Sequence, residues 1–468
     1  MVFSSLVFLF VFLPTIIFLY YIAKDKYKNY LLLIASLFFY AWGEPVYIVI
    51  MLISIIVNFI FGKNVCKNKP NKQRKLWLVT SVIFNITMLV VFKYIGFFIE
   101  NINRVLGSDI HNPDIALPLG ISFFTFQAMS YVIDVYRDDA KAQNSLLNLA
   151  LYISLFPQLV AGPIVRYQTV ADQIDEREHN LDKFTNGVNR FIVGLGKKVL
   201  LSNSLGLLAD NVFGTQIESL TICSAWIGIV AYSLQIFFDF SGYSDMAIGL
   251  GKMFGFEFLE NFNYPYISKS AGEFWRRWHI SLGSWFRDYV YIPLGGSRKG
   301  NLRTYINLFI VWFLTGFWHG ASWTFIAWGL YFGILIALEK AFLNKILSKI
   351  YMPIRHLYLI IVVIIGWIFF RADNFSYAFN YIKCLFGING NGLYDNFTLM
   401  YFNDYIYIII VSIIFSTPIV RIISTKLNKF KNNHIYYILK SIIFMSIFIS
   451  VLIKLVNSTY NPFLYFRF

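Results

Sequence analysis

His319 is the residue of this sequence best suited to acid–base chemistry in an apolar environment. It lies in the run 314–323, and about thirty residues around it carry almost no charge, so we expect it at membrane depth. An imidazole titrates near neutrality and is costly to leave unpaired in hydrocarbon, so a histidine at this depth is by default a functional-site hypothesis. The alternative is that it only hydrogen-bonds a neighbouring helix.

The segment 273–289 is both aromatic and charged, and it contains a second histidine. At about 100° per residue, one face would carry Trp275, Trp278, His279, Leu282, Trp285, Phe286 and Tyr289, and the opposite face Arg276, Arg277, Ser284, Arg287 and Asp288. This pattern predicts one amphipathic helix at the cytoplasmic interface. Its arginines could bind an anionic donor such as a nucleotide or a phosphopantetheine, because guanidinium forks suit phosphate. Alternatively, they bind only lipid phosphate, and His279 packs among tryptophans.

Small and acidic residues flank these histidines. Gly316 and Gly320 are spaced as GxxxG, and Gly329 and Gly333 repeat the spacing, which predicts close helix approach. Two carboxylates, Asp239 and Asp245, lie in the apolar run 235–246 and are expected to be hydrogen-bond partners inside the bundle. Either one could instead orient an imidazole.

The composition requires a membrane. Hydrophobic residues make up 57% of the 468 and charged residues 14%, and the mean hydropathy is +0.59. The net charge of +15 is explained by lysines and arginines in short loops, so no nucleic acid is expected. The three cysteines form no CxxC pair, and neither a P-loop nor HExxH occurs, so we expect no metal site and no nucleotide hydrolysis.

Apolar segments recur along the whole chain, at 2–22, 30–42, 45–61, 76–99, 115–136, 146–161, 187–212, 221–250, 304–318, 320–338, 356–371, 405–423 and 435–457. The basic loops 63–75 and 421–434 are expected to be cytoplasmic, which places both termini outside the cytoplasm. Several segments are shorter than the ~20 residues of a perpendicular span. We therefore expect re-entrant or broken helices, with breaks at 118–120, 157 and 162–163, where proline interrupts helix.

In order, the motifs 239–245, 274–282, 291–296 and 318–320 resemble those of the membrane-bound O-acyltransferase family, in particular its alginate O-acetyltransferase-like branch. The resemblance runs nearly end to end and includes the related teichoic acid D-alanyl transferases. It implies an all-α, polytopic integral membrane protein of a single domain, 1–468, with core motifs in 235–338. About eleven spans and re-entrant helices would surround a central funnel or tunnel.

The same resemblance implies the chemistry. The family moves an acyl group from a cytoplasmic thioester, here acetyl-CoA, onto a hydroxyl, with no bound cofactor. The catalytic residues would be His319 and His279, and the donor would contact Trp275, Arg276, Arg277 and Ser281. Expected partners are membrane lipids, a polysaccharide acceptor and an extracytoplasmic, SGNH-hydrolase-like acetyltransferase.

The tail, 458–468, resembles the C-terminal aromatic tails of polysaccharide acetyltransferases and of the small peptide that assists D-alanyl transfer. This resemblance makes Tyr465 a candidate acyl relay, and the alternative is an interfacial anchor. Two other functions stay open at this point. One is D-alanyl transfer to teichoic acid, and the other, of a different class, is a transporter or flippase.

Overall fold

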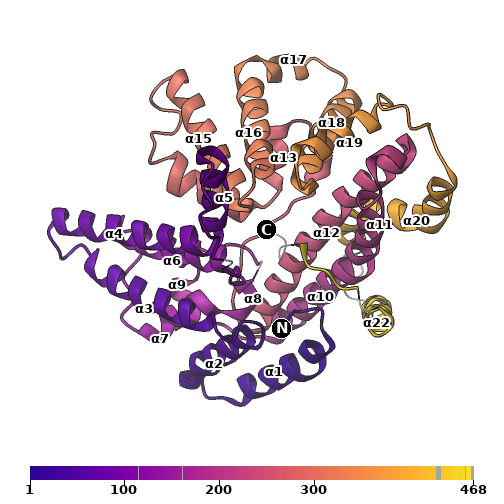
Figure 1. Cartoon of the computed structure of the whole chain (residues 1–468). Helices are drawn as coiled ribbons and strands as arrows, with labels where there is room; N and C mark the ends of the chain where they lie inside the picture. Colours follow the sequence, from indigo (N-terminus) through magenta and orange to yellow (C-terminus); the bar gives the residue numbers. More distant parts are fainter. Residues whose placement is uncertain (114, 161, 428, 430–433, 459, 465–468) are drawn as a thin grey trace. The chain divides into compact units, whose positions relative to one another are not determined.

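The computed structural model describes residues 1–113, 115–160, 162–427, 429, 434–458 and 460–464, and every regular element among them is a helix (Figure 1). The all-helical prediction is confirmed. Tyr465, the candidate relay, lies outside the described residues.

The chain divides into two compact units. The first consists of Met1–Phe191 and Ser244–Leu259, and the second of Ile192–Tyr243 and Glu260–Phe468. Helices of the first unit are η1 (Phe8–Phe12), α1 (Leu13–Ile22), α2 (Asp25–Gly43), α3 (Ile48–Asn64), α4 (Asn71–Leu89), η2 (Val90–Tyr94), α5 (Ile95–Leu106), α6 (Ile121–Tyr136), α7 (Leu146–Ser154), α8 (Phe156–Leu159) and α9 (Tyr167–Asp175). Two long helices, α10 (Leu181–Gly196) and α12 (Ile222–Met253), contribute residues to both units. The prediction of a single domain stays a prediction.

The second unit contains every motif discussed above except the end of 239–245. Its remaining helices are η3 (Lys197–Ser202), α11 (Asn203–Phe213), η4 (Ile217–Ser219), η5 (Pro265–Ile267), α13 (Ala271–Arg277), α14 (Ile280–Phe286), η6 (Arg287–Tyr291), α15 (Asn301–His319), α16 (Trp323–Leu338), η7 (Glu339–Leu343), α17 (Asn344–Leu347), α18 (Met352–Arg371), α19 (Phe375–Leu385), α20 (Asn396–Phe415), α21 (Ile419–Leu427) and α22 (His434–Asn457).

Seven helical stretches among the described residues are long and apolar enough to cross a membrane, namely Asn71–Leu106, Leu181–Phe213, Ile222–Met253, Trp323–Leu347, Met352–Arg371, Asn396–Phe415 and His434–Asn457. Phe8–Ile22 and Ile48–Asn64 are apolar but shorter. The multi-pass prediction is confirmed, whereas the count of about eleven spans stays a prediction.

The predicted interruptions of helix are present in the first unit. Gly120 has a left-handed φ of 71° and precedes α6, and a Cβ at this position would lie 2.8 Å from the carbonyl oxygen of Leu159. The apolar segment 146–161 is divided into α7 and the four-residue α8, with Pro157 in the first turn of α8. The sequence therefore predicted these breaks correctly, and re-entry into the membrane stays an expectation.

The prediction of one continuous helix over 273–289 is wrong. Helix α13 ends at Arg277, Trp278 is extended, and His279 has a left-handed φ of 45° before α14 begins. The amphipathic pattern itself is correct, because Trp278, His279, Leu282, Trp285, Phe286 and Tyr289 are buried, while Arg276 and Arg287 are exposed. Both half-helices keep the same period, so the pattern could not reveal the break between them.

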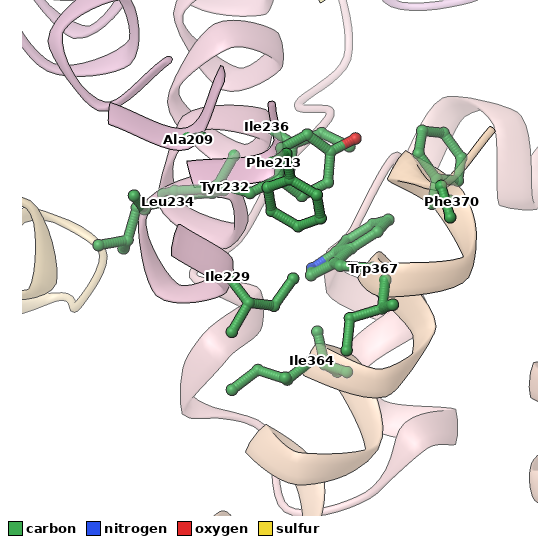
Figure 2. Close-up of a cluster of buried hydrophobic side chains, with 14 of the residues drawn as sticks. Ala209, Phe213, Ile229, Tyr232, Leu234, Ile236, Ile364, Trp367 and Phe370 are labelled. Atoms are coloured by element: carbon green, nitrogen blue, oxygen red, sulfur yellow. The ribbon is translucent and has the colours of Figure 1, made fainter. Parts of the chain in front are cut away.

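A hydrophobic core in the second unit joins α11, α12 and α18. Figure 2 shows labelled members of this cluster on α11 (Ala209 and Phe213), on α12 (Ile229, Tyr232, Leu234 and Ile236) and on α18 (Ile364, Trp367 and Phe370), with Leu234 pointing away from α18. Trp367 and Phe370 also belong to the candidate site described below. The core thus fixes part of the wall of that site.

Helices α15 and α16 pack closely along each other at four glycines. A Cβ on Gly316 would lie against the carbonyl oxygen of Phe325, and a Cβ on Gly329 would lie 2.9 Å from the Cα of Gly316. Gly320 and Gly333 face the side chains of Phe325 and Trp312 in the same way. The prediction that these glycines allow close helix approach is confirmed.

Candidate active site

His319 is the last residue of α15, at a sharp change of backbone direction. Gly320 is extended, and Ser322 begins α16 by accepting a hydrogen bond from the amide of Thr324. The side chain is 7% exposed and lines a small cavity of about 30 Å³. A cavity of this size holds one or two water molecules, because a water needs roughly 10–15 Å³ of such volume.

Aromatic rings from three helices surround this imidazole. The ring centroid of His319 lies 4.9 Å from that of Trp328 on α16, 5.0 Å from that of Trp318 on α15 and 5.3 Å from that of Phe370 on α18. The first contact is edge-to-face, with an interplanar angle of 86°. The packing holds the imidazole in one place, which a general base requires before its pKa matters.

His279 is fixed between α13 and α14 by Asn261. The side-chain oxygen of Asn261 accepts hydrogen bonds from the Ser281 amide at 3.1 Å and from the Ser281 hydroxyl at 2.9 Å, and it lies 3.1 Å from His279 Nδ1. Because this oxygen can only accept, Nδ1 carries the proton and Nε2 keeps its lone pair. Nε2 is buried and has no hydrogen-bond partner in the part of the chain that the structure describes.

Burial lowers the pKa of His279 to about 3. The physical cause is desolvation, which disfavours the charged imidazolium. His279 is therefore neutral throughout the physiological pH range, and its Nε2 can accept a proton or a hydrogen bond. Its left-handed backbone is a strained conformation of the kind found at functional sites.

A cavity of about 360 Å³ lies against α13 and α14. Its lining includes His279 and two of the predicted donor-binding residues, Trp275 and Arg276, together with Arg287. The other two predicted residues are not among the lining residues. Arg277 pairs with Glu273 at 3.0 Å, and Ser281 is bonded to Asn261. The structure thus brings one predicted arginine to the cavity, adds Arg287, and uses Ser281 to hold Asn261.

A third cavity, of about 670 Å³, has a polar lining. Asp210, Arg371 and Asp373 contribute charge, and Ser322 and Thr324 contribute hydroxyls. Arg371 and Asp210 form an ion pair of 2.9 Å. Hydroxyl-rich ligands are bound by carboxylates, hydroxyls and aromatic rings, and Phe213 and Tyr232 supply the rings here.

These three cavities are neighbours within the second unit. Trp278 lines both the His319 cavity and the arginine-lined cavity, whereas Phe370 and Leu464 line both the His319 cavity and the polar cavity. The His319 cavity therefore shares one lining residue with the basic cavity and two with the polar one. The two neighbouring cavities differ in chemistry, one with arginines in its lining and the other with carboxylates and hydroxyls.

The buried carboxylates of the 239–245 motif bind cations. Asp239 pairs with Lys198, and Asp245 pairs with Arg190 at 2.6 Å. Asp239 also lines the His319 cavity and accepts the backbone N–H of Leu464 at 2.9 Å. These contacts favour the structural interpretation of Asp239 over a role in orienting an imidazole.

Lys198 and Asn261 are among the residues of the site that were not recognised from the sequence. Lys198 is a cation within the apolar run 187–212. A charge in such a run is unusual and indicates a specific role, so this residue could have been singled out. Asn261 gave no signal, because its role depends on a contact with His279, 18 positions away. Within the described part of the chain, no cluster of three or more His, Cys, Asp and Glu could hold a metal ion.

Comparison with known proteins gives consistent matches. The profile of the membrane-bound O-acyltransferase family matches residues 73–379. The chain is 44% identical to the probable alginate O-acetylase of Pseudomonas aeruginosa, over 82% of this chain and 75% of that protein. It is 35% identical to the peptidoglycan O-acetyltransferase of Helicobacter pylori, over 84% and 81%. A teichoic acid D-alanyltransferase of Bacillus subtilis is 31% identical over 48% of this chain and 59% of that protein.

Proposed function

Because this chain belongs to the membrane-bound O-acyltransferase family, we propose that it passes an acetyl group from cytoplasmic acetyl-CoA across the membrane for O-acetylation of an exported or cell-surface polysaccharide. The chain is an acyltransferase, so the alternative of a transporter or flippase is wrong. One observation carries the proposal for the site: His319 lines a cavity that shares walls with a basic cavity and with a polar one.

The donor occupies the cavity lined by Arg276 and Arg287. Their guanidinium groups bind the phosphates of the donor, and Trp275 packs against its apolar part. Neutral His279 offers Nε2 to the same cavity and holds the donor in register. The thioester carbon then lies beside His319.

The acceptor hydroxyl enters through the polar cavity. His319 takes the hydroxyl proton as the oxygen attacks the thioester carbon, so a C–O bond forms and a tetrahedral oxyanion develops. Collapse of this intermediate breaks the C–S bond, and the leaving thiolate receives the proton from the imidazolium. The step is balanced, and His319 is regenerated as the free base.

Replacement of His319 tests this assignment. We expect His319→Ala to remain folded in the membrane and to lose transfer by about 10²–10⁴-fold, because general-base catalysis typically contributes that much. Acetyl transfer from labelled acetyl-CoA in proteoliposomes measures the loss. The exposed His111 is the control, and His111→Ala should retain full activity. Normal transfer by a well-folded His319→Ala protein would remove His319 from its role.

Tyr465 is proposed to receive the acetyl group first and to relay it. The described tail supports this, because Leu464, which precedes it, lines the His319 cavity and is 6% exposed. In this case the phenol is the hydroxyl from which His319 takes the proton: its oxygen attacks the thioester carbon, the C–S bond breaks, and the thiolate leaves with that proton. An extracytoplasmic, SGNH-hydrolase-like acetyltransferase would then move the acetyl group from the tyrosyl ester to a hydroxyl of the polysaccharide. Tyr465→Phe keeps the ring but lacks the nucleophile. We expect it to lose transfer to polymer, and normal transfer by this variant would reject the relay.

D-alanyl transfer to teichoic acid is the second candidate. It is supported by the D-alanyltransferase match, which covers 48% of this chain. Acetyl transfer is preferred because relatives named as O-acetylases or O-acetyltransferases match more of the chain at higher identity.

A further inference from the structure

The described end of the chain, 460–464, is packed into the second unit beside the reacting histidine. Phe463 and Leu464 both line the His319 cavity. The ring of Phe463 lies 5.0 Å from that of Tyr243 on α12, which holds it against this helix. The C-terminal segment is therefore part of the wall of the candidate active site.

Two charged residues inside the helical core bind the backbone of this segment. Lys198 and Asp239 are 3% and 2% exposed, and they form an ion pair between η3 and α12. The Lys198 ammonium also donates to the carbonyl oxygen of Pro462, and the second carboxylate oxygen of Asp239 accepts the N–H of Leu464. Each charge thus makes one bond to its partner and one to the tail.

These bonds fix the register of the tail, because they are made to backbone groups on either side of Phe463. Lys198 lies in a π-helical turn, a local distortion that is common at functional sites. An ion pair buried between two helices is not needed to hold them, since well-packed apolar residues usually serve as well. The bonds to the tail give this pair a purpose that apolar residues could not fulfil.

Polar contacts continue along the tail toward the polar cavity. Asn203 of α11 donates to the side-chain oxygen of Asn461 at 3.1 Å. The hydroxyl of Tyr460 donates to Asp210 at 2.7 Å, and Asp210 is also paired with Arg371. Asp210 and Arg371 line the polar cavity, so the tail is held at both ends of its described length.

We propose that Lys198 and Asp239 are positioning residues that hold the C-terminal segment as a wall of the His319 cavity. The inference rests on the proposed function for its catalytic consequence, but the anchoring itself does not depend on catalysis.

A paired replacement tests the anchor. Lys198→Met with Asp239→Leu removes both charges together, so no unpaired charge is left in the core. Leu464→Cys, in a chain whose three native cysteines are replaced, reports exposure of the tail through its rate of reaction with a maleimide. We expect the paired replacement to raise this rate by about tenfold or more, because a tail without its two anchors leaves its packed position more often.

The Arg190–Asp245 pair is the matched control, because it is likewise an ion pair to α12, made from α10, the helix that directly precedes η3. Arg190→Met with Asp245→Leu should leave the labelling of residue 464 unchanged. His319→Ala should leave it unchanged as well, so failure of the proposed function and failure of the anchor give different results. Unchanged labelling in a folded protein that lacks Lys198 and Asp239 would overturn the inference.

Truncation separates positioning from a general structural role. A chain ending at residue 459 lacks both the anchored segment and Tyr465, and we expect it to lose transfer by at least about 10²-fold, the effect of displacing a positioned group. The paired replacement should cause a similar loss in the full chain and no further loss in the truncated chain. A further loss there would show that Lys198 and Asp239 act by another route, and would also overturn the inference.

Discussion

Three buried tryptophans, Trp278, Trp328 and Trp367, line the cavity of His319, and the N–H groups of the last two differ in their hydrogen-bond partners. Trp367 donates to the hydroxyl of Tyr266 at 3.2 Å. The indole nitrogen of Trp328 is buried and has no hydrogen-bond partner among residues of the described chain. An unsatisfied buried donor costs about 1–3 kcal/mol, so its presence beside a catalytic base suggests a ligand in another state. A thioester oxyanion formed next to His319 would be such a ligand.

Removal of the Trp328 N–H tests this role. Trp328→Phe keeps an aromatic ring against His319, and we expect it to lower kcat by about 10²–10³-fold, as loss of one oxyanion donor does, with little change in KM. Trp367→Phe is the control, because it lines the same cavity but its N–H is already bonded to Tyr266. Steady-state acetyl transfer at saturating donor measures both. Equal losses in the two variants would mean that only ring packing matters.

Residue types and order predicted His319 and His279, but not the partners that fix them. Trp318 is next to His319 in the sequence, whereas Trp328, nine residues along, lines the cavity. Asn261 and Lys198 act through contacts with residues far away in sequence. Such contacts follow from tertiary packing, which one sequence does not reveal.

At the scale of elements, the position of His319 depends on the packing of α15 against α16. Gly316 precedes His319 by three residues, or nearly one turn, and faces Gly329. A Cβ at either glycine would meet backbone atoms of the facing helix. Backbone atoms cannot move aside as the end of a flexible side chain can. The two helices can approach this closely only without side chains at these positions.

Gly316→Ala and Gly329→Ala should each destabilise the protein by about 1–3 kcal/mol, because overpacking forces the helices apart. Acetyl transfer should fall as well, since His319 would shift with α15. Thermal unfolding in detergent measures the stability. Gly283→Ala on α14 is the control for stability, because the nearest atom to its new Cβ would be 3.8 Å away, an ordinary contact. Stability equal to that of the unchanged protein in both interface variants would contradict this account.

Helix positions followed closely from apolar patterning, and helix continuity did not. The break between α13 and α14 lies within an unbroken aromatic pattern, and it is stabilised by Asn261, which accepts bonds from both Ser281 and His279. The π-helical turns η3 and η6 also had no sequence signal. By contrast, proline and glycine located the breaks before α6 and α8, because those residues act through their own backbone.

At the scale of the molecule, the apolar helices differ in how much of their length is buried inside the protein. In α12, 72% of the apolar window is buried, whereas only 11% is buried in α20 and 6% in α22. Apolar helices with exposed surfaces of this kind are expected to face lipid, because water would disfavour them. The composition therefore predicted the membrane class, and the charged residues on buried helices, such as Lys198 and Asp239, were the exceptions with a specific role.

At the scale of the whole molecule, the identity of the transferred group can be tested in the cell. Deletion of the coding sequence should remove O-acetyl groups from one surface or exported polysaccharide and leave D-alanine esters of teichoic acid unchanged. The physical reason is the site: a cavity with two arginines suits a phosphate-rich donor, and a hydroxyl-lined cavity suits an acceptor with hydroxyls. Mass spectrometry of base-released acetate and D-alanine from purified glycans measures both groups.

The same experiment needs two complemented strains to assign the result to His319. The unchanged chain should restore the O-acetyl groups, and His319→Ala, expressed to the same level, should not. If the deletion removed D-alanine and left the O-acetyl groups in place, the transferred group would be D-alanine and not acetyl. That result would leave the role of His319 as base intact. Restoration of acetylation by His319→Ala would instead reject His319 as the base, because another group must then take the hydroxyl proton.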